Sequence, residues 1–235
     1  MKITAVALCV ALAPLAHAET GSPPAQTPPP SEAKTPAKPA TDAGVAALVA
    51  RMQKFYESTR DLHARFEQVV STGTGRKRMA TGDVWLKKPG RMRWDYQKPE
   101  KKLMVADGET LWIYEPEDQQ VFRQSMTASS LPSSVSFLFG KGRLSDEFEI
   151  TRETSSDLAR PGEVVLKLVP RQATAQYRYL VFLVDEKTAM VTGTVVYDQQ
   201  GGQSRLDFQN VEVNRGVADD KFQFKPPAGT RILQP

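Results

Sequence analysis

GDVWLKKPGRMRWDY, residues 82–96, is the stretch that decides the fold of this 235-residue chain. On either side of Lys88-Pro89-Gly90, apolar and polar side chains alternate with a period of two, which is typical of strands that bury one face. The Pro-Gly step between the two runs is a turn signal. The stretch therefore predicts an antiparallel hairpin, in which Met92, Trp94 and Tyr96 share one face of the second strand.

The same period of two continues toward both ends of the chain. Asp107-Gly108 is the strongest short hairpin signal, and most of the other runs are separated by short turns. The predicted strands beyond the first hairpin cover residues 62–67, 103–106, 109–115, 120–124, 147–152, 163–170, 177–185, 191–198, 205–214 and 221–225. We expect a mainly β protein with an antiparallel sheet of about eleven strands.

Two segments show helical spacing instead. After Asp42, a fair N-cap, apolar residues recur at every third or fourth position up to Tyr56, which predicts an amphipathic helix at the start of the domain. Within 127–142, Leu138 and Phe139 belong to a second helical pattern, and we expect one or two short helices there. An apolar helix stripe needs a surface to cover, so these helices are expected to lie on one face of the sheet.

Several predicted strands carry large apolar residues on both faces, for example Leu111 and Ile113 beside Trp112. This pattern leaves two interpretations open. In the first, helices cover one face of the sheet and the other face is partly exposed. In the second, the sheet is strongly curved, and its concave side encloses a cavity that binds an apolar ligand.

The first eighteen residues have the features of an export signal. Lys2 is followed by an apolar stretch and a small-x-small site, which predicts a secretory signal peptide, residues 1–18, cleaved after Ala18. Leu8 precedes Cys9 where a lipoprotein signal needs a small residue. We therefore expect an exported protein that is not anchored by a lipid at Cys9.

Residues 19–42 contain seven prolines and no aromatic or large aliphatic residue. Such a segment cannot bury enough apolar surface to offset the entropy of ordering it, so we expect a disordered, extended linker. Residues 43–235 remain as one folded domain, and no stretch of them is apolar enough to predict a transmembrane helix.

After signal removal the chain has no cysteine and a single histidine, His63, which is expected at the surface. This composition excludes disulfides, cysteine metal ligands and cysteine nucleophiles. The run 72–75, TGTG, fits a flexible hairpin turn better than a phosphate loop. We expect no enzymatic activity, no catalytic residues, no metal, no cofactor and no nucleic-acid partner. The net charge of +4 weakly indicates acidic partners or anionic head groups.

A set of motifs in fixed order resembles a known family. Residues 82–96 and DGETLWIY at 107–114 match the pattern of the LolA family of periplasmic carriers of outer-membrane lipoproteins, and FEQ at 66–68 and FQFKPPAGT at 222–230 match its ends. The resemblance implies an unclosed half-barrel of antiparallel strands, with the N-terminal helix and the short middle helices covering the concave face as a lid.

The resemblance also implies a function in lipoprotein transport. Such a protein is a periplasmic chaperone that carries lipidated proteins from the inner to the outer membrane and shields their acyl chains in an apolar cavity. The implied partners are the acyl chains, an inner-membrane ABC transporter of LolCDE type and, where present, an outer-membrane acceptor of LolB type. The chain itself is expected to be a monomer. The alternatives are a carrier or sensor of another amphiphile such as a glycolipid, and an envelope scaffold or polysaccharide-binding module.

The resemblance and the strand parity together indicate which residues act. Those expected to line the acyl-chain cavity are Val84, Leu86, Met92, Trp94, Leu111, Ile113, Leu138 and Phe139. Members of the family commonly have an arginine, whose hydrogen bonds hold the lid shut, at the position that is Lys88 here. Because lysine lacks the planar fork of arginine, the predicted lid latch is Lys88 with Arg91 or Arg93 as a substitute.

Overall fold

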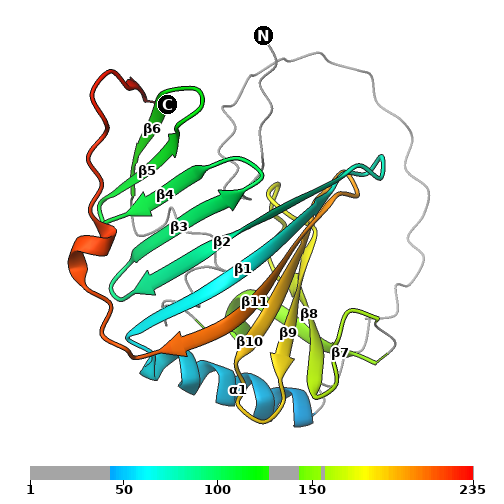
Figure 1. The fold of residues 1–235 in the computed structure, drawn as a ribbon. Coiled ribbons are helices and arrows are strands. Elements are labelled where there is room, and N and C mark those ends of the chain that lie inside the picture. The colour runs from blue at the N-terminus through cyan, green and yellow to red at the C-terminus, as the bar shows by residue number, and fades with distance from the viewer. Residues whose placement is uncertain (1–42, 127–142, 155–156, 235) are drawn as a thin grey trace, which may run out of the picture.

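The structure is a computed structural model that describes residues 43–126, 143–154 and 157–234. Its strands form one sheet of twelve, in the order β12-β6-β5-β4-β3-β2-β1-β11-β10-β9-β8-β7 (Figure 1). The strands are β1 Asp61–Ser71, β2 Lys77–Lys87, β3 Arg91–Lys98, β4 Lys102–Ala106, β5 Thr110–Glu115, β6 Gln120–Ser125, β7 Phe148–Glu153, β8 Glu163–Pro170, β9 Tyr179–Asp185, β10 Val191–Tyr197, β11 Gln203–Val213 and β12 Arg231–Leu233. The helices are α1 Ala43–Ser58, α3 Leu144–Glu147 and the 3-10 helix η1 Asp219–Phe222.

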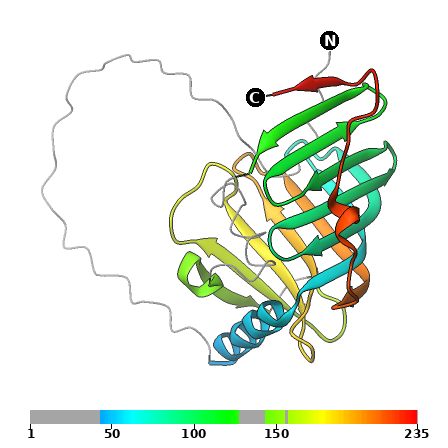
Figure 2. The same ribbon diagram turned by 90° about the vertical axis from the view of Figure 1, so that its left-hand side faces the viewer.

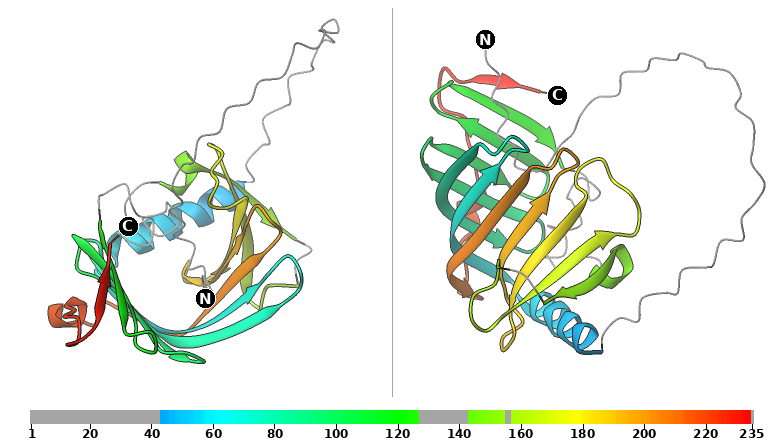
Figure 3. Two further views of the ribbon diagram at one scale, coloured as in Figure 1. Left: turned by 90° about the horizontal axis from the view of Figure 1, so that it is seen from above. Right: turned by 90° about the vertical axis from the view of Figure 1, so that its right-hand side faces the viewer.

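The sheet is strongly curved and does not close, because its edge strands β7 and β12 do not pair with each other. Seen from above in Figure 3, α1 lies across the open, concave side of the curved sheet. This arrangement confirms the predicted mainly β, unclosed half-barrel with an N-terminal helix. The middle helices expected within 127–142, with Leu138 and Phe139, lie outside the described residues.

The chain after β11 differs from the prediction. Residues 221–225, predicted as a strand, contain the end of η1 and irregular chain, while the last strand is β12, which pairs in parallel with β6. The alternation that suggested a strand is real: Phe222 is buried, and the Lys221 ammonium lies 3.9 Å from the centre of the Trp85 ring. These side chains pack onto the outer face of a sheet whose inner strands already have both neighbours, so the segment forms no ladder there.

Two core clusters fill the concave side. The first lies between the apolar stripe of α1 and strands β7 to β10, and includes Met52 and Tyr56 of the helix with Phe182 of β9. The second lies on β1 to β5 around Phe66 and Trp94. None of the helices in the described ranges is both long and apolar enough to cross a membrane.

Parts of the convex face are covered as well, which explains the apolar residues on both faces of several strands. On β8 to β10, a third cluster around Val181 and Leu183 packs against Leu158 of the preceding loop. On β5, the ring of Trp112 lies 5.9 Å from that of Phe224, between centroids. Figure 2 shows the chain from β11 to β12 passing along the outside of the sheet. Neither of the two interpretations of strands with apolar residues on both faces included segments of the chain that cover the convex face.

Candidate functional site

The concave faces of β1, β2 and β3 form a continuous apolar surface, which we call the concave wall. Strand register places Leu62 opposite Leu86, Ala64 opposite Val84, and Val84 in turn opposite Trp94. The members of the wall, all buried, are Leu62, Ala64, Phe66, Val84, Leu86, Met92, Trp94 and Tyr96. The period of two in the sequence creates this wall, because every second residue of each strand points to the same side.

A pocket lies between this wall and the C-terminal part of α1. Its cavity volume is about 20 Å³, and it is partly open to solvent. Its lining residues are Tyr56, Leu62, Ala64, Val84, Leu86, Trp94, Val191, Phe208 and Val211, and none of them carries a charge. Such a lining suits an apolar ligand.

Tyr56 connects the helix to β10, across the pocket from the concave wall. Its hydroxyl accepts a hydrogen bond from the backbone N–H of Val191 in β10, with 3.1 Å between the two atoms. Burial raises the pKa of this phenol, because the charged form would lose its hydration. Tyr56 therefore stays neutral and holds the last turn of α1 against β10.

Lys88 lies at the end of the β2–β3 hairpin and reaches the C-terminus of α1. Its Nζ donates to the backbone oxygen of Tyr56 at 2.5 Å and to that of Glu57 at 3.1 Å. The last carbonyls of a helix lack partners within the helix, and a cation there is favoured by the helix dipole. Desolvation lowers the pKa of Lys88, and the charge of Glu57 opposes this shift.

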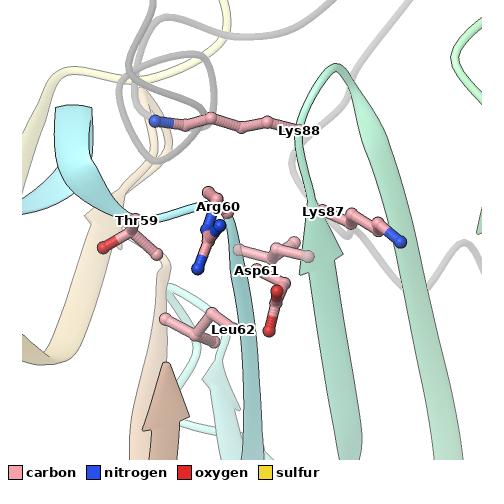
Figure 4. Close-up of a pocket in the computed structure, with 7 residues that line it drawn as sticks. Thr59, Arg60, Asp61, Leu62, Lys87 and Lys88 are labelled. Atoms are coloured by element: carbon pink, nitrogen blue, oxygen red, sulfur yellow. The ribbon is translucent and has the colours of Figure 1, made fainter. Parts of the chain in front are cut away.

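Figure 4 shows Lys87 and Lys88 pointing away from each other beside a second, smaller pocket that Thr59, Asp61 and Leu62 also line. Lys87 Nζ lies 2.5 Å from the Asp219 carboxylate of η1, on the convex side. Lys87 and Lys88, which are adjacent in the chain, therefore bind two different elements, η1 and α1.

Arg91 and Arg93 also face η1 and not α1. The Arg91 guanidinium lies 2.7 Å from the Asp219 carboxylate, and Arg93 Nη1 donates to the backbone oxygen of Lys221 at 3.3 Å. Together with Lys87, Arg91 lowers the pKa of Asp219 by hydrogen bonding. Of the three predicted latch residues, Lys88 alone contacts the helix in this structure, and the latch role of all three stays a prediction.

One buried polar cluster interrupts the apolar surface farther along β1. The Tyr96 hydroxyl donates to Gln68 Oε1 at 3.1 Å, and Gln68 Nε2 donates to Ser204 Oγ at 3.0 Å. Gln68 is only 2 % exposed. Its side chain thus links β1 to β3 and β11 inside the sheet.

The predicted cavity residues fall into three groups. Val84, Leu86 and Trp94 line the pocket. Met92, Leu111 and Ile113 belong to the same core cluster but do not line it. Leu138 and Phe139 lie outside the described residues. Contact of any of these residues with lipid stays a prediction.

Sequence reasoning missed several lining residues. Leu62 and Ala64 belong to the run 62–67, which was predicted as a strand. The alternation of this strand alone could have placed both residues in the site. Phe208 and Val211 of β11 could not be found in this way, because three positions separate them and no single alternation puts both on one face.

His63 lies outside the pocket, on the convex side of β1. Its ring stacks on that of Trp85 with 4.8 Å between centroids, and its Nε2 lies 3.2 Å from the Asp83 carboxylate. Across the ranges 43–126, 143–154 and 157–234, no group of three or more His, Cys, Asp or Glu side chains is arranged to hold a metal ion.

The chain is similar to a group of carrier proteins. The family model described as "Outer membrane lipoprotein carrier protein LolA" matches residues 57–225. A protein named outer-membrane lipoprotein carrier protein from Methylococcus capsulatus is 31% identical over 186 residues, which cover 78% of this chain and 86% of the relative. Its namesake from Methylobacillus flagellatus is 30% identical over 188 residues, covering 79% and 88% of the two chains.

Among solved structures, an uncharacterized conserved protein from Thermus thermophilus superposes with a TM-score of 0.51. The match covers 81% of this chain and 98% of that one at 11% identity, so it shows a shared fold alone. The family match, by contrast, extends over most of the chain and includes the hairpin that builds the concave wall. The chain belongs to the LolA family of outer membrane lipoprotein carrier proteins.

Proposed function

We propose that this protein is a periplasmic chaperone that carries lipidated proteins from the inner to the outer membrane and shields their acyl chains against the concave wall. The names of its relatives support the general carrier role. The observation that carries the proposal is the uncharged pocket between the wall and α1. The protein acts by binding and release, with no chemical step.

The energetics suit a carrier. Burying a chain of about sixteen carbons, at about 0.8 kcal/mol per methylene, is worth on the order of 12 kcal/mol relative to water. Relative to a bilayer the transfer is close to neutral, because the interior of the bilayer and the apolar site of the protein are similar solvents for an acyl chain. The protein can therefore keep acyl chains out of water and still release them to an acceptor for a modest difference in affinity.

The structure corresponds to a closed state in this proposal. A pocket of about 20 Å³ is far too small for the several long acyl chains of a lipoprotein, so cargo entry requires α1 to move away from the wall. Besides its apolar stripe, the described contacts that oppose this movement are the hydrogen bond of Tyr56 with β10, those of Arg51 with the backbone oxygens of Glu186 and Lys187 at 2.9 and 2.5 Å, and those of Lys88, which alone of the three ties α1 to the hairpin of the wall. Lys88 is therefore the proposed latch.

The partners follow from the direction of transport. Extraction of acyl chains from a membrane requires external work, and we infer that an inner-membrane ABC transporter of LolCDE type supplies it. A LolB-type acceptor with higher affinity would receive the cargo. The carrier itself is proposed to be a monomer. It is proposed to lose residues 1–18 on export and to keep residues 19–42 as a linker. Mass spectrometry of the exported protein tests the predicted cleavage after Ala18.

A displacement titration tests the carrier proposal. The folded protein is expected to bind an apolar fluorophore, and a lipidated peptide is expected to displace it while the same peptide without lipid does not. Failure of the protein to bind either the fluorophore or the lipidated peptide would remove the proposal. Mass spectrometry of lipids that co-purify from the native host separates lipoprotein cargo from another amphiphile such as a glycolipid.

Met92→Glu places a charge in the concave wall, where the side chain is 4 % exposed. An unpaired buried carboxylate is costly, so the variant is expected to lose lipid binding while keeping its far-UV circular dichroism. The matched control is Val169→Glu on the outer face of β8, which introduces the same charge at a position that is 38 % exposed and should leave binding unchanged. Equal binding by both variants would contradict the placement of cargo on this wall.

A further inference from the structure

The tip of the β1–β2 hairpin carries three consecutive cations that the proposed carrier site does not use. Residues 72–79, TGTGRKRM, are all exposed, and Arg76, Lys77 and Arg78 stand side by side in them. Met79 follows with 58 % of its surface exposed, more than any other exposed large hydrophobic residue in the described ranges. Figure 1 shows this hairpin extending outward from the sheet.

The backbone of the tip is ordered. The N–H of Thr72 donates to the backbone oxygen of Arg76 at 2.9 Å, and the N–H of Gly75 donates to that of Thr72 at 2.8 Å. Gly73 lies against the neighbouring β10–β11 turn, since a Cβ at this position would come within 2.7 Å of the Gln200 backbone oxygen. The cations are therefore presented from a fixed position.

These cations have no carboxylate partner among the residues that the structure describes, unlike many others in the sheet. Lys87 and Arg91 share Asp219, and Arg160 and Arg205 share Asp207. Three adjacent like charges repel one another. The repulsion at the tip is thus left uncompensated within the described parts of the chain.

More positive charge lies at the same end of the sheet. Lys98, at the end of β3, is paired in register with Thr81 of β2, and Lys101 follows in the β3–β4 turn; both are exposed. Glu100 stands between them, and Glu117 and Asp118 lie in the neighbouring β5–β6 turn, so the positive charge of this end is concentrated at the β1–β2 tip. The opposite end of β2 leads to Lys88 and α1, so the basic end lies away from the proposed latch.

We propose that this basic end, centred on Arg76, Lys77 and Arg78, docks the protein on the anionic surface of a phospholipid bilayer. Each Lys or Arg near an anionic leaflet contributes about a fivefold gain in affinity. Met79 adds an apolar side chain that can enter the interface. A few cations and one such side chain give reversible binding and no permanent anchor, which suits a protein that must leave one membrane for another.

Flotation with vesicles tests the docking surface. The protein purified from expressing cells is mixed with vesicles that contain phosphatidylglycerol or with vesicles of phosphatidylcholine alone, and the bound fraction is measured. We expect binding to the anionic vesicles only. Raising the salt from about 0.1 M to about 1 M shortens the Debye length from about 10 Å to about 3 Å and should abolish it.

The triple variant Arg76→Ser, Lys77→Ser, Arg78→Ser is expected to lose on the order of a hundredfold in affinity for anionic vesicles. The matched control, Lys187→Ser, Arg215→Ser, Lys225→Ser, removes the same charge at exposed positions away from the tip and should lose less than about fivefold. Thermal unfolding of both variants is expected to match that of the unmodified protein, because all six side chains are exposed.

The proposal would be overturned if the two triple variants had equal affinity for anionic vesicles, or if the unmodified protein bound equally to both kinds of vesicle. It would also be overturned if the tip variant lost binding to an acidic protein while its binding to anionic vesicles was unchanged. Displacement of the fluorophore by lipidated peptide is expected to be the same in the tip variant as in the unmodified protein. Failure of the carrier proposal and failure of the docking proposal are therefore seen in different assays.

Discussion

At the scale of single residues, the position of Lys88 matters most for the proposed movement of α1. The ammonium donates to two terminal carbonyls of the helix, those of Tyr56 and Glu57; the Tyr56 oxygen also accepts from the N–H of Thr59 at 3.2 Å. A lysine makes these bonds as a compact point charge and an arginine as a planar fork, so the two side chains hold the helix end with different geometry.

Lys88→Met keeps most of the length of the side chain and removes its donors. Because the closed state loses this contact, we expect the apparent affinity for the apolar fluorophore to rise roughly fivefold, which corresponds to about 1 kcal/mol for a partly exposed charged hydrogen bond. Lys88→Arg is the control that restores a donor and should return the affinity to near its original value. Unchanged affinity in Lys88→Met would contradict the latch role.

Asp219 gives a pH dependence to the packing of η1. Its pKa is lowered by hydrogen bonds from Lys87 and Arg91, so the folded protein binds the proton less readily than the unfolded chain does. The resulting stability is present above the unfolded pKa of about 4 and is lost as the pH falls through the lower folded value. We expect Asp219→Asn to be less stable than the unmodified protein at pH 7 and equally stable near pH 2, as measured by urea unfolding. A difference that persists unchanged at low pH would show that the carboxylate charge is not the cause.

At the scale of elements, the sheet is held by long ladders and α1 by side chains. β1 pairs along its whole length with β2 and along most of it with β11, whereas α1 rests on one apolar stripe and a few hydrogen bonds. The element that must move in the proposed mechanism is thus one that can leave without breaking a strand ladder.

Hydrogen exchange tests this difference. Amides of α1 are expected to exchange at least about tenfold faster than those of β1. Local opening of the helix exposes less buried surface than opening of the sheet does, and it therefore costs less free energy. Addition of lipidated peptide should speed exchange in α1 further, while the same peptide without lipid should not. Protection of α1 equal to that of β1 in both conditions would argue against a moving lid.

Gln68 joins three strands through its side-chain amide. In Gln68→Leu, the Tyr96 hydroxyl and Ser204 Oγ lose their partner while remaining in the sheet, and we expect a loss of about 1–3 kcal/mol in the free energy of unfolding. The double variant Gln68→Leu, Tyr96→Phe also removes the stranded hydroxyl, so it should lose less than the sum of the two single changes. Full additivity in urea unfolding would show that the bond contributes nothing.

At the scale of the whole molecule, one sheet connects two cores. The cluster on β1 to β5 extends across the β1–β11 pairing, which runs from Leu62–Val213 to Ser71–Gln203, and the cluster under α1 lies beyond it on β7 to β10. Curvature of this single sheet creates the concave side, and its open edges leave room for a lid.

The continuous sheet is expected to unfold in one step. The three tryptophans lie in β2, β3 and β5, so their fluorescence reports this half of the sheet, whereas far-UV circular dichroism reports all strands. Because the β1–β11 ladder couples the two halves, the urea transitions followed by the two probes should coincide. Separate midpoints would show that the halves unfold independently.

The sequence by itself determined the local elements. Alternation within 82–96 placed Val84 with Leu86, and Met92 with Trp94, on one face of their strands, and helical spacing up to Tyr56 indicated α1, because period and turn chemistry are properties of neighbouring residues. Family motifs then indicated the unclosed half-barrel. Leu62 and Ala64 were within reach of the same parity rule.

Only the tertiary structure decided what depends on residues far apart in the chain. It brought Phe208 and Val211 to the pocket, directed Arg91 and Arg93 to η1, and replaced a predicted strand at 221–225 with a segment that packs on the outside of the sheet. The physical reason is that a strand pattern records which side chains are buried but not what buries them. Whether the cover is a helix, another strand or the end of the chain is set by contacts between segments, and these follow from how the whole sheet curves.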